Sequence, residues 1–283
     1  MSNQNGKLYV VATPIGNLSD ISYRAVEILQ TVDLIAAEDT RHVRQLIQHY
    51  GISNKLTSLH QHNEQHASPL LIKKMQQGLS IALVSDAGTP LISDPGLPLI
   101  KLAKASGITV SPIPGACALI AAISASGLPM NRFMFEGFLP RTSSARKTFF
   151  RNKLDCPYTW VVYESSHRIL ATIKDISEIL PGERAIVIAR ELTKLYETIV
   201  KTTVNEALEL FERDENMHRG EFVIMIAGAE PAQNQNDISP EQEKLLTVLL
   251  KECSMKSAVA MAVEITGARK KTLYQAALKL SNL

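Results

Sequence analysis

The chain has 283 residues, of which 45% are hydrophobic and 20% are charged. This length favours two domains, and the composition excludes a disordered or fibrous protein. Thirty Lys and Arg against 28 Asp and Glu leave a formal net charge of +2. A strongly basic protein that wraps nucleic acid is therefore excluded, and any basic surface must be local.

The cysteines and the N-terminal residues indicate the compartment. Cys117, Cys156 and Cys253 are far apart and form no CxxC pair, so we expect neither a disulfide framework nor a thiolate zinc site. Residues 1–7 are polar and lead into only a short apolar run, so no signal peptide is expected. Residues 105–131 carry no charge, but prolines and glycines interrupt them, which favours a buried strand-turn-helix unit over a membrane span. The sequence predicts a cytoplasmic protein without a membrane segment.

Residues 1–129 alternate short β-branched runs with amphipathic segments, a pattern typical of α/β units around a mostly parallel sheet. Strands are predicted at residues 8–12, 34–37, 81–85 and 108–111. Apolar residues at spacings of three and four predict helices at residues 20–31, 40–50, 68–77 and 97–106. A run of small residues predicts a further helix at 116–126. We expect an N-terminal α/β domain that ends near Pro129.

Residues 130–228 predict a second α/β domain of a different kind. Its strands are expected at residues 133–138, 159–163, 185–189, 198–201 and 222–227. Adjacent β runs with fewer intervening helices favour a mixed sheet. Residues 229–240 have the composition of a linker, and residues 241–283 predict a helical domain with helices at 242–251, 256–265 and 269–280. A turn at Gly267 gives the last two helices the spacing of a helix-turn-helix.

Three loops follow predicted strands of the first domain, at residues 13–17, 85–96 and 114–118. No glycine pair forms GxG and there is no Walker A sequence, so a Rossmann dinucleotide site and a P-loop are both disfavoured. The loop at 85–96 holds two Ser-Asp pairs, two prolines and two glycines, and a rigid loop of this length usually binds something. By themselves, residues 13–17 are equally consistent with an ordinary turn. The small residues after 114, taken alone, favour close helix packing over a ligand site.

Several motifs carry a family resemblance. PIG at 14–16, GTP at 88–90 and PGACALIAAISASGLP at 114–129 resemble the tetrapyrrole methylase superfamily, which binds S-adenosylmethionine between two α/β domains. ATPIGNLSDIS, AAEDTR, HQHNE, SDAGTPLISDPG, YESSHR and ARELTKLYE are similar to the bacterial small-subunit ribosomal RNA (cytidine-2'-O-)-methyltransferases. The resemblance spans residues 8–228. It implies 2'-O-methylation of a cytidine ribose in 16S ribosomal RNA, free or in the small ribosomal subunit, by a homodimer.

The superfamily pattern also implies which residues contact the methyl donor. They are Pro14, Ile15, Asp86, Ala87, Gly88, Thr89, Ile92, Cys117, Ala118, Tyr163, Glu164, Glu221 and Phe222. The superfamily's Gly-Asp-Pro reads Gly-Thr-Pro here, which removes one carboxylate, and Asp86 is the candidate to replace it. The donor already carries its leaving group, so the enzyme chiefly aligns the reacting atoms and no metal is expected.

A ribose hydroxyl is weakly acidic, so a general base should assist its attack. Asp39, His60 and Glu164 are the candidates. Each has an alternative interpretation: Asp39 as a helix N-cap, His60 in a solvated polar loop, and Glu164 in an ion pair with Arg168.

Candidate RNA contacts are Glu38, Arg41, Arg141, Arg146, Lys147 and Arg190. Residues 141–153 hold five basic side chains, no acidic one and two phenylalanines, which suits phosphate contacts with nearby base stacking. A helix with its phenylalanines in the core is compatible with this. The segment 241–283, with seven Lys and Arg against four Asp and Glu, is either an auxiliary RNA surface or a packing or dimerisation module. The rival functions are methylation of a small tetrapyrrole-like substrate and a non-enzymatic helix-turn-helix regulator.

Overall fold

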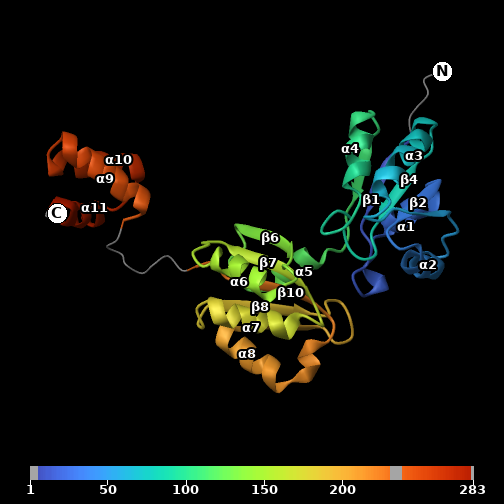
Figure 1. The fold of residues 1–283 in the computed structure, drawn as a ribbon. Coiled ribbons are helices and arrows are strands. Elements are labelled where there is room, and N and C mark those ends of the chain that lie inside the picture. The colour runs from blue at the N-terminus through green and yellow to red at the C-terminus, as the bar shows by residue number, and fades with distance from the viewer. Residues whose placement is uncertain (1–5, 230–237, 282–283) are drawn as a thin grey trace. The chain divides into compact units, whose positions relative to one another are not determined.

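The structure, a computed structural model, describes residues 6–229 and 238–281. The chain divides into two compact units, Met1–Gly228 and Ala229–Leu283 (Figure 1). The first unit contains two five-stranded sheets in succession, and three helices form the second. Within the described ranges, no helix has both the length and the apolar character needed to cross a membrane.

The first sheet is entirely parallel and has the strand order β3-β2-β4-β1-β5. Its strands are β1 (Leu8–Val11), β2 (Leu34–Ala37), β3 (Leu56–Ser58), β4 (Ile81–Val84) and β5 (Val110–Ile113). Every residue of β2 and β4 is buried, because helices cover both faces and each side chain meets a core. The predicted parallel sheet is thus confirmed.

The helices of this half lie in two layers. The helices α1 (Tyr23–Thr31) and α2 (Thr40–His49) pack on one face, and α3 (Glu64–Gln76) and α4 (Leu97–Ala105) pack on the other. The chain thus leaves the adjacent strands β1 and β4 toward opposite faces. Their carboxyl ends form a topological switch point, where open α/β sheets bind ligands.

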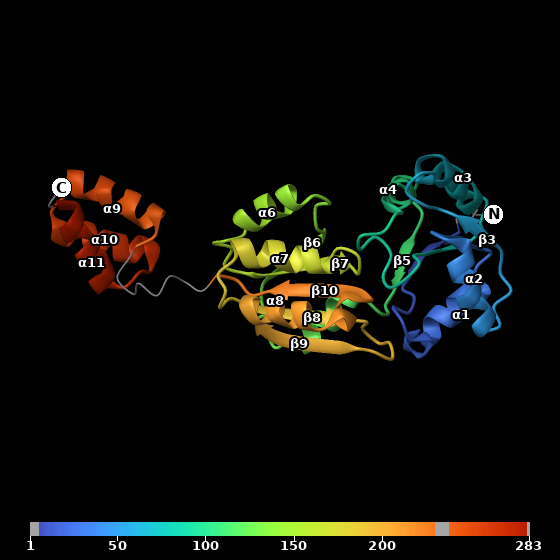
Figure 2. The same cartoon turned by 60° about the horizontal axis from the view of Figure 1, so that its bottom comes forward.

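The second sheet is mixed, as predicted, with the order β6-β7-β10-β8-β9. The pair of β6 with β7 is parallel and the other pairs are antiparallel. The strands are β6 (Phe133–Phe138), β7 (Thr159–Ser165), β8 (Ala185–Arg190), β9 (Thr198–Thr203) and β10 (Glu221–Ile226). The helices α6 (Ser143–Arg151), α7 (Ile169–Ile179) and α8 (Val204–Arg213) pack on one face (Figure 2), and α5 (Ala118–Ala125) packs on the other.

The structure differs from the predicted elements in a few places. The strand β3 was missed, since it has three residues and a single leucine. The helix α3 begins at Glu64 rather than at residue 68, and Pro69 lies inside it rather than at its start. The strand β5 begins two residues late. Neither α7 nor α8 was predicted, although Thr203 and Glu206 form a capping box at the start of α8.

The second unit consists of α9 (Pro240–Glu252), α10 (Met255–Thr266) and α11 (Lys270–Ser281). Leu246, Val259 and Leu273 contribute one residue each to their shared core. Gly267 ends α10 in the left-handed conformation, with φ +66°, which turns the chain sharply into α11. The helix-turn-helix-like domain is confirmed. The predicted linker, 229–240, lies mostly outside the described residues, as do residues 1–5.

Candidate functional site

A cavity of about 450 Å³ opens at the carboxyl ends of β1, β2 and β4, with its remaining wall supplied by the second sheet. Small-molecule sites fall in the range of about 300 to 1,000 Å³. The lining residues are Ile15, Glu38, Asp86, Ala87, Gly88, Thr89, Ile92, Ser93, Asp94, Cys117, Ala118, Phe138, Tyr163, Glu164, Ser165, Leu192, Glu221, Phe222 and Val223.

The loops after β1 and β4 are pinned together at the switch point. The Thr13 N–H donates to Gly88 O at 2.8 Å, and the Gly88 N–H donates to Thr13 O at 3.0 Å. Gly88 has φ +79°, and a Cβ there would lie 3.2 Å from Ile15 Cγ2. A side chain at this position would therefore be strained and would press on a cavity-lining residue.

The long loop between β4 and α4 is held in a strained shape. Leu91 and Ser93 have φ of +76° and +72°, which costs roughly 1–2 kcal/mol for each residue. Thr89 Oγ1 donates to Ala116 O at 3.0 Å and so ties this loop to the segment after β5. The threonine that stands in place of the superfamily's aspartate thus supports the shape of the site, in which Ser93 and Asp94 line the cavity.

The second sheet closes the cavity with apolar and aromatic side chains. The Tyr163 hydroxyl accepts a hydrogen bond from the Leu119 N–H at 3.0 Å, and its ring meets Phe138 edge-on at 5.7 Å. Burial raises the pKa of Tyr163, so its hydroxyl stays neutral. The loop after β8 approaches the loop after β1 at Gly16, where a Cβ would lie 2.9 Å from Thr193 Oγ1. Glycine at this position allows the two halves to meet.

Carboxylates gather on one side of the cavity. Burial raises the pKa of Glu38 to about 7, and the charges of Asp86 and Asp94 add to the shift. Burial likewise raises the pKa of Asp94 to about 6, against an opposing hydrogen bond from Ser85. Because each carboxylate disfavours the ionisation of its neighbours, the group suits a positively charged ligand or a proton transfer.

Twelve of the thirteen predicted donor contacts line this cavity, and Pro14 is the exception. Glu38, predicted as a substrate contact, lines it as well. Contact of these residues with a donor stays a prediction. Sequence reasoning missed six lining residues: Ser93, Asp94, Phe138, Ser165, Leu192 and Val223. Of these, Ser93 and Asp94 lie in the SDAGTPLISDPG motif, and their position at a strand end was the available signal.

Two predicted catalytic residues, Asp39 and His60, are not among the lining residues. The Asp39 carboxylate caps α2 and accepts hydrogen bonds from the Arg41 guanidinium at 2.6 to 3.1 Å. These bonds hold the pKa of Asp39 well below its usual range, which makes it a weak base. The loop that carries His60 is organised by Asn63 Oδ1, which accepts from the His60 N–H at 2.8 Å. The structure thus favours the N-cap interpretation of Asp39, whereas the role of His60 stays a prediction.

Glu164 lines the cavity, but its carboxylate is fully occupied. One oxygen accepts from Thr172 Oγ1 at 2.8 Å and lies 3.2 Å from the Arg168 guanidinium, and the other accepts from the Ser165 N–H. With its side chain entirely buried, Glu164 is an anchor for Arg168 rather than the predicted base. In residues 6–229 and 238–281, no group of three or more His, Cys, Asp or Glu could hold a metal ion.

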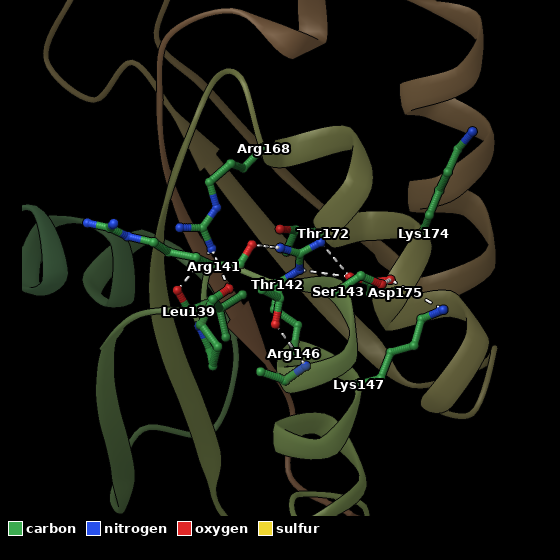
Figure 3. Close-up of polar contacts among 12 residues, drawn as sticks. Leu139, Arg141, Thr142, Ser143, Arg146, Lys147, Arg168, Thr172, Lys174 and Asp175 are labelled. Carbon is green, nitrogen blue, oxygen red and sulfur yellow. Dashed lines mark hydrogen bonds and ion pairs between the residues drawn. The ribbon is translucent and has the colours of Figure 1, made fainter.

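The predicted RNA contacts at the start of α6 separate into buried and exposed groups (Figure 3). Arg146 forms an ion pair with Asp175 at 2.6 Å, and the two side chains are only 5% and 6% exposed. The prediction that Arg146 contacts RNA is wrong, because its guanidinium is buried. Arg168 donates to Leu139 O and to Pro140 O at 2.9 and 2.8 Å, which fixes the loop before Arg141. Arg141 itself is exposed and extends away from the cluster.

Most of the other predicted RNA contacts are bonded to residues of this chain. Lys147 lies 2.6 Å from Glu178, and Arg190 Nε donates to Arg219 O at 2.6 Å. Arg41 bonds Asp39, yet 86% of its side chain is exposed. Arg41 and Arg141 are therefore the predicted cations most free to meet RNA.

Comparison with known proteins gives the class to which this fold and cavity belong. The Tetrapyrrole (Corrin/Porphyrin) Methylases match residues 7–208, and the RsmI C-terminal HTH domain matches residues 236–281. The solved structure of uroporphyrin-III-C-methyltransferase from Thermus thermophilus shares the fold, with a TM-score of 0.53 and 17% identity. The match covers 78% of this chain and 94% of that chain.

Relatives of similar length narrow the class. The Ribosomal RNA small subunit methyltransferase I of Haemophilus influenzae is 48% identical over 275 residues, which cover 97% of each chain. The protein of the same name from Pasteurella multocida is 49% identical over 282 residues and covers 100% of each chain. The chain therefore belongs to the tetrapyrrole methylase family, in the branch of the ribosomal RNA small subunit methyltransferase I proteins.

Proposed function

We propose that this protein transfers the methyl group of S-adenosylmethionine to the 2'-hydroxyl of a cytidine ribose in 16S ribosomal RNA. The observation that carries the proposal is the cavity at the switch point of the first sheet, in a chain that belongs to this family. The cavity combines apolar walls with free carboxylates, as a cationic donor and a hydroxyl acceptor require.

The residues present fit the proposed donor. A bound S-adenosylmethionine supplies an activated methyl group on a positively charged sulfur. Leu192 and Val223 would offer apolar surface to its flat ring, and Ala87 and Gly88 would let it approach the backbone. The carboxylates that follow β2 and β4 would favour its positive charge. The chain would then position the acceptor oxygen and exclude water from the cavity.

Arg141 and Arg41 are the proposed phosphate contacts beside the cavity. Phe138, which lines the cavity, lies on the strand that leads into the Arg141 loop. Arg168 holds that loop in place through two backbone carbonyls (Figure 3). An arginine held near the cavity would bind the phosphate backbone of the RNA and so position the RNA without reading the base sequence.

The three-helix unit carries basic side chains that support a second RNA surface. Arg269, Lys270 and Lys271 are exposed at the turn and start of α11, the position of the recognition helix in a helix-turn-helix. Tyr274, 47% exposed one turn later, could stack on a base. We propose that this unit adds affinity for folded RNA.

We also propose that two copies of the chain pair in the cytoplasm. Ile120 on α5 and Phe133 and Met134 on β6 are large apolar side chains between 36% and 54% exposed, and a second copy would cover them. The three cysteines are free, which suits a reducing compartment.

Tritium transfer from methyl-labelled S-adenosylmethionine tests the function. The acceptors are small ribosomal subunits from cells that lack this protein, and the control is large subunits from the same cells. We expect about one methyl group per small subunit and none on large subunits. Equal labelling of both, or labelling of neither while a small tetrapyrrole is methylated, would overturn the proposal.

A further inference from the structure

Five carboxylates line the cavity, and three of them are bound by other groups of this chain. Glu164 is held by Arg168 and Thr172, as described above. Glu221 lies 2.8 Å from Lys194 Nζ. Asp86 accepts the Asp39 N–H at 2.8 Å, and its other carboxylate oxygen lies 4.0 Å from His42 Nδ1, a side-chain nitrogen. A carboxylate already bound in this way is poorly placed to take a proton from a substrate.

Glu38 and Asp94 remain. In the described part of the chain, no Lys, Arg or His nitrogen lies within 4.0 Å of either carboxylate. A hydrogen bond from Ser85 lowers the pKa of Asp94 and so opposes the effect of burial. Among the described residues, no side chain is hydrogen-bonded or ion-paired to the Glu38 carboxylate, and a backbone hydrogen bond from Asp86 lowers its pKa against the effect of burial. Glu38 is thus the least committed carboxylate of the cavity wall.

The position of Glu38 in the fold also suits a residue that takes a proton from a substrate. It directly follows β2, at the sheet edge where the loops of β1 and β4 meet. The charged and titratable groups on neighbouring elements are Asp86 and Asp94 after β4, Asp39, Arg41 and His42 at the start of α2, and His60 after β3. Arg41 is paired with Asp39, so the near field at Glu38 is dominated by acids.

We propose that Glu38 is the residue that accepts the proton of the ribose 2'-hydroxyl during methyl transfer. Asp94 is then a positioning residue whose charge makes Glu38 hold that proton more strongly. The inference rests on the proposed function. It assigns the base to a residue that sequence reasoning treated only as a substrate contact.

The proposed step balances in atoms and charge. The ribose oxygen gives its proton to a Glu38 carboxylate oxygen and forms a bond to the methyl carbon. The carbon–sulfur bond breaks, and its electron pair remains on sulfur as a neutral thioether. Burial and the neighbouring acids raise the pKa of Glu38 to about 7, so it is a stronger base than an exposed glutamate and is ionised above neutral pH.

The test compares Glu38→Gln with a matched control, Glu27→Gln, which changes an exposed glutamate on α1. Single-turnover methyl transfer to small ribosomal subunits is measured from pH 5.5 to 9, and donor affinity is measured by calorimetry. We expect Glu38→Gln to lower the transfer rate at pH 8 by about 100-fold or more, with donor affinity changed less than 3-fold. Glu27→Gln should match the wild type in both.

The pH dependence of the methyl-transfer rate distinguishes the role of Glu38 from that of Asp94. The wild-type rate should rise tenfold per pH unit and level off above about pH 7. This rise should be absent in Glu38→Gln. In Asp94→Asn it should remain but move to lower pH, because removing the charge of Asp94 lowers the pKa of Glu38.

Three results would overturn the inference: Glu38→Gln keeps the wild-type rate and profile, Glu38→Gln loses donor binding to the same extent as rate, or Asp94→Asn removes the rise. In each of these the wild-type protein still methylates small subunits. If the wild type transfers no methyl group at all, the proposed function itself has failed, and the two failures are thereby distinguished.

Discussion

Two variants that each replace one arginine of the same basic segment, one buried and one exposed, give the sharpest test of the structure. Arg146→Met removes the guanidinium that pairs with Asp175 at 2.6 Å and that donates to Arg141 O at 2.9 Å. Losing one partner of a buried ion pair costs about 3 to 5 kcal/mol. Asp175 keeps Ser143 at 2.6 Å and Lys147 at 3.6 Å, so we expect the lower end, about 3 kcal/mol.

A loss of this size should lower the thermal midpoint by about 6 to 12 °C for a body of this length. Scanning calorimetry or urea unfolding measures it. Arg141→Met is the matched control, and we expect its midpoint to change by less than about 2 °C because the side chain is exposed. Its effect should appear in RNA affinity, with the slope of log affinity against log salt reduced by about 1. If Arg146→Met left the midpoint unchanged, the buried network of Figure 3 would be wrong.

Three further predictions concern the cavity and the second unit. Thr89→Tyr should fill the cavity and abolish donor binding, as measured by calorimetry. Thr89→Ser keeps the hydroxyl that bonds Ala116 O, so it should bind the donor within about 3-fold of the wild type. Normal donor binding by Thr89→Tyr would contradict the assignment of the cavity as the donor site. Deleting residues 229–283 should weaken RNA binding at least 10-fold and leave donor affinity intact, and a collapse of donor affinity would mean that the unit forms part of the site. Glu38→Gln should also change stability with pH. The pKa of Glu38 is raised from 4.5 to about 7, so the stability present below pH 4.5 is lost as pH rises to 7. This shift corresponds to about 3 kcal/mol for a buried group, and partial exposure of Glu38 reduces it to about 1 kcal/mol. Urea unfolding should therefore show Glu38→Gln more stable than the wild type at pH 8 and equal to it at pH 4. Equal stability at pH 8 would contradict the raised pKa of the half-buried Glu38.

Sequence reasoning located the cavity because its signals are local. Gly88 and Thr89 follow a run of buried β-branched and apolar residues, and a proline-glycine turn precedes Cys117. Since the carboxyl ends of parallel strands share one edge of a sheet, recognising the strands was enough to bring these loops together.

The roles of individual charges could not be predicted in the same way, because they depend on partners distant in sequence. Arg141 and Arg146 look alike in a basic segment, and only the packing of α6 on α7 brings Asp175 to one of them. Glu164 follows a strand as Glu38 does, yet Thr172 and Arg168 satisfy its carboxylate. Asp94 was not predicted because two of the left-handed residues that shape the loop before it, Leu91 and Ser93, are not glycines and give no sequence signal of a turn.

The central claim is that this cavity directs a methyl group onto a ribose oxygen of small-subunit RNA. The most direct measurement is alkaline hydrolysis of the RNA labelled by the purified protein, because a 2'-O-methyl group blocks cleavage of the adjacent phosphodiester bond. We predict that the tritium is recovered in an alkali-resistant dinucleotide whose methylated nucleoside is cytidine. Recovery of the tritium in single nucleotides would place the methyl group on a base and contradict the account.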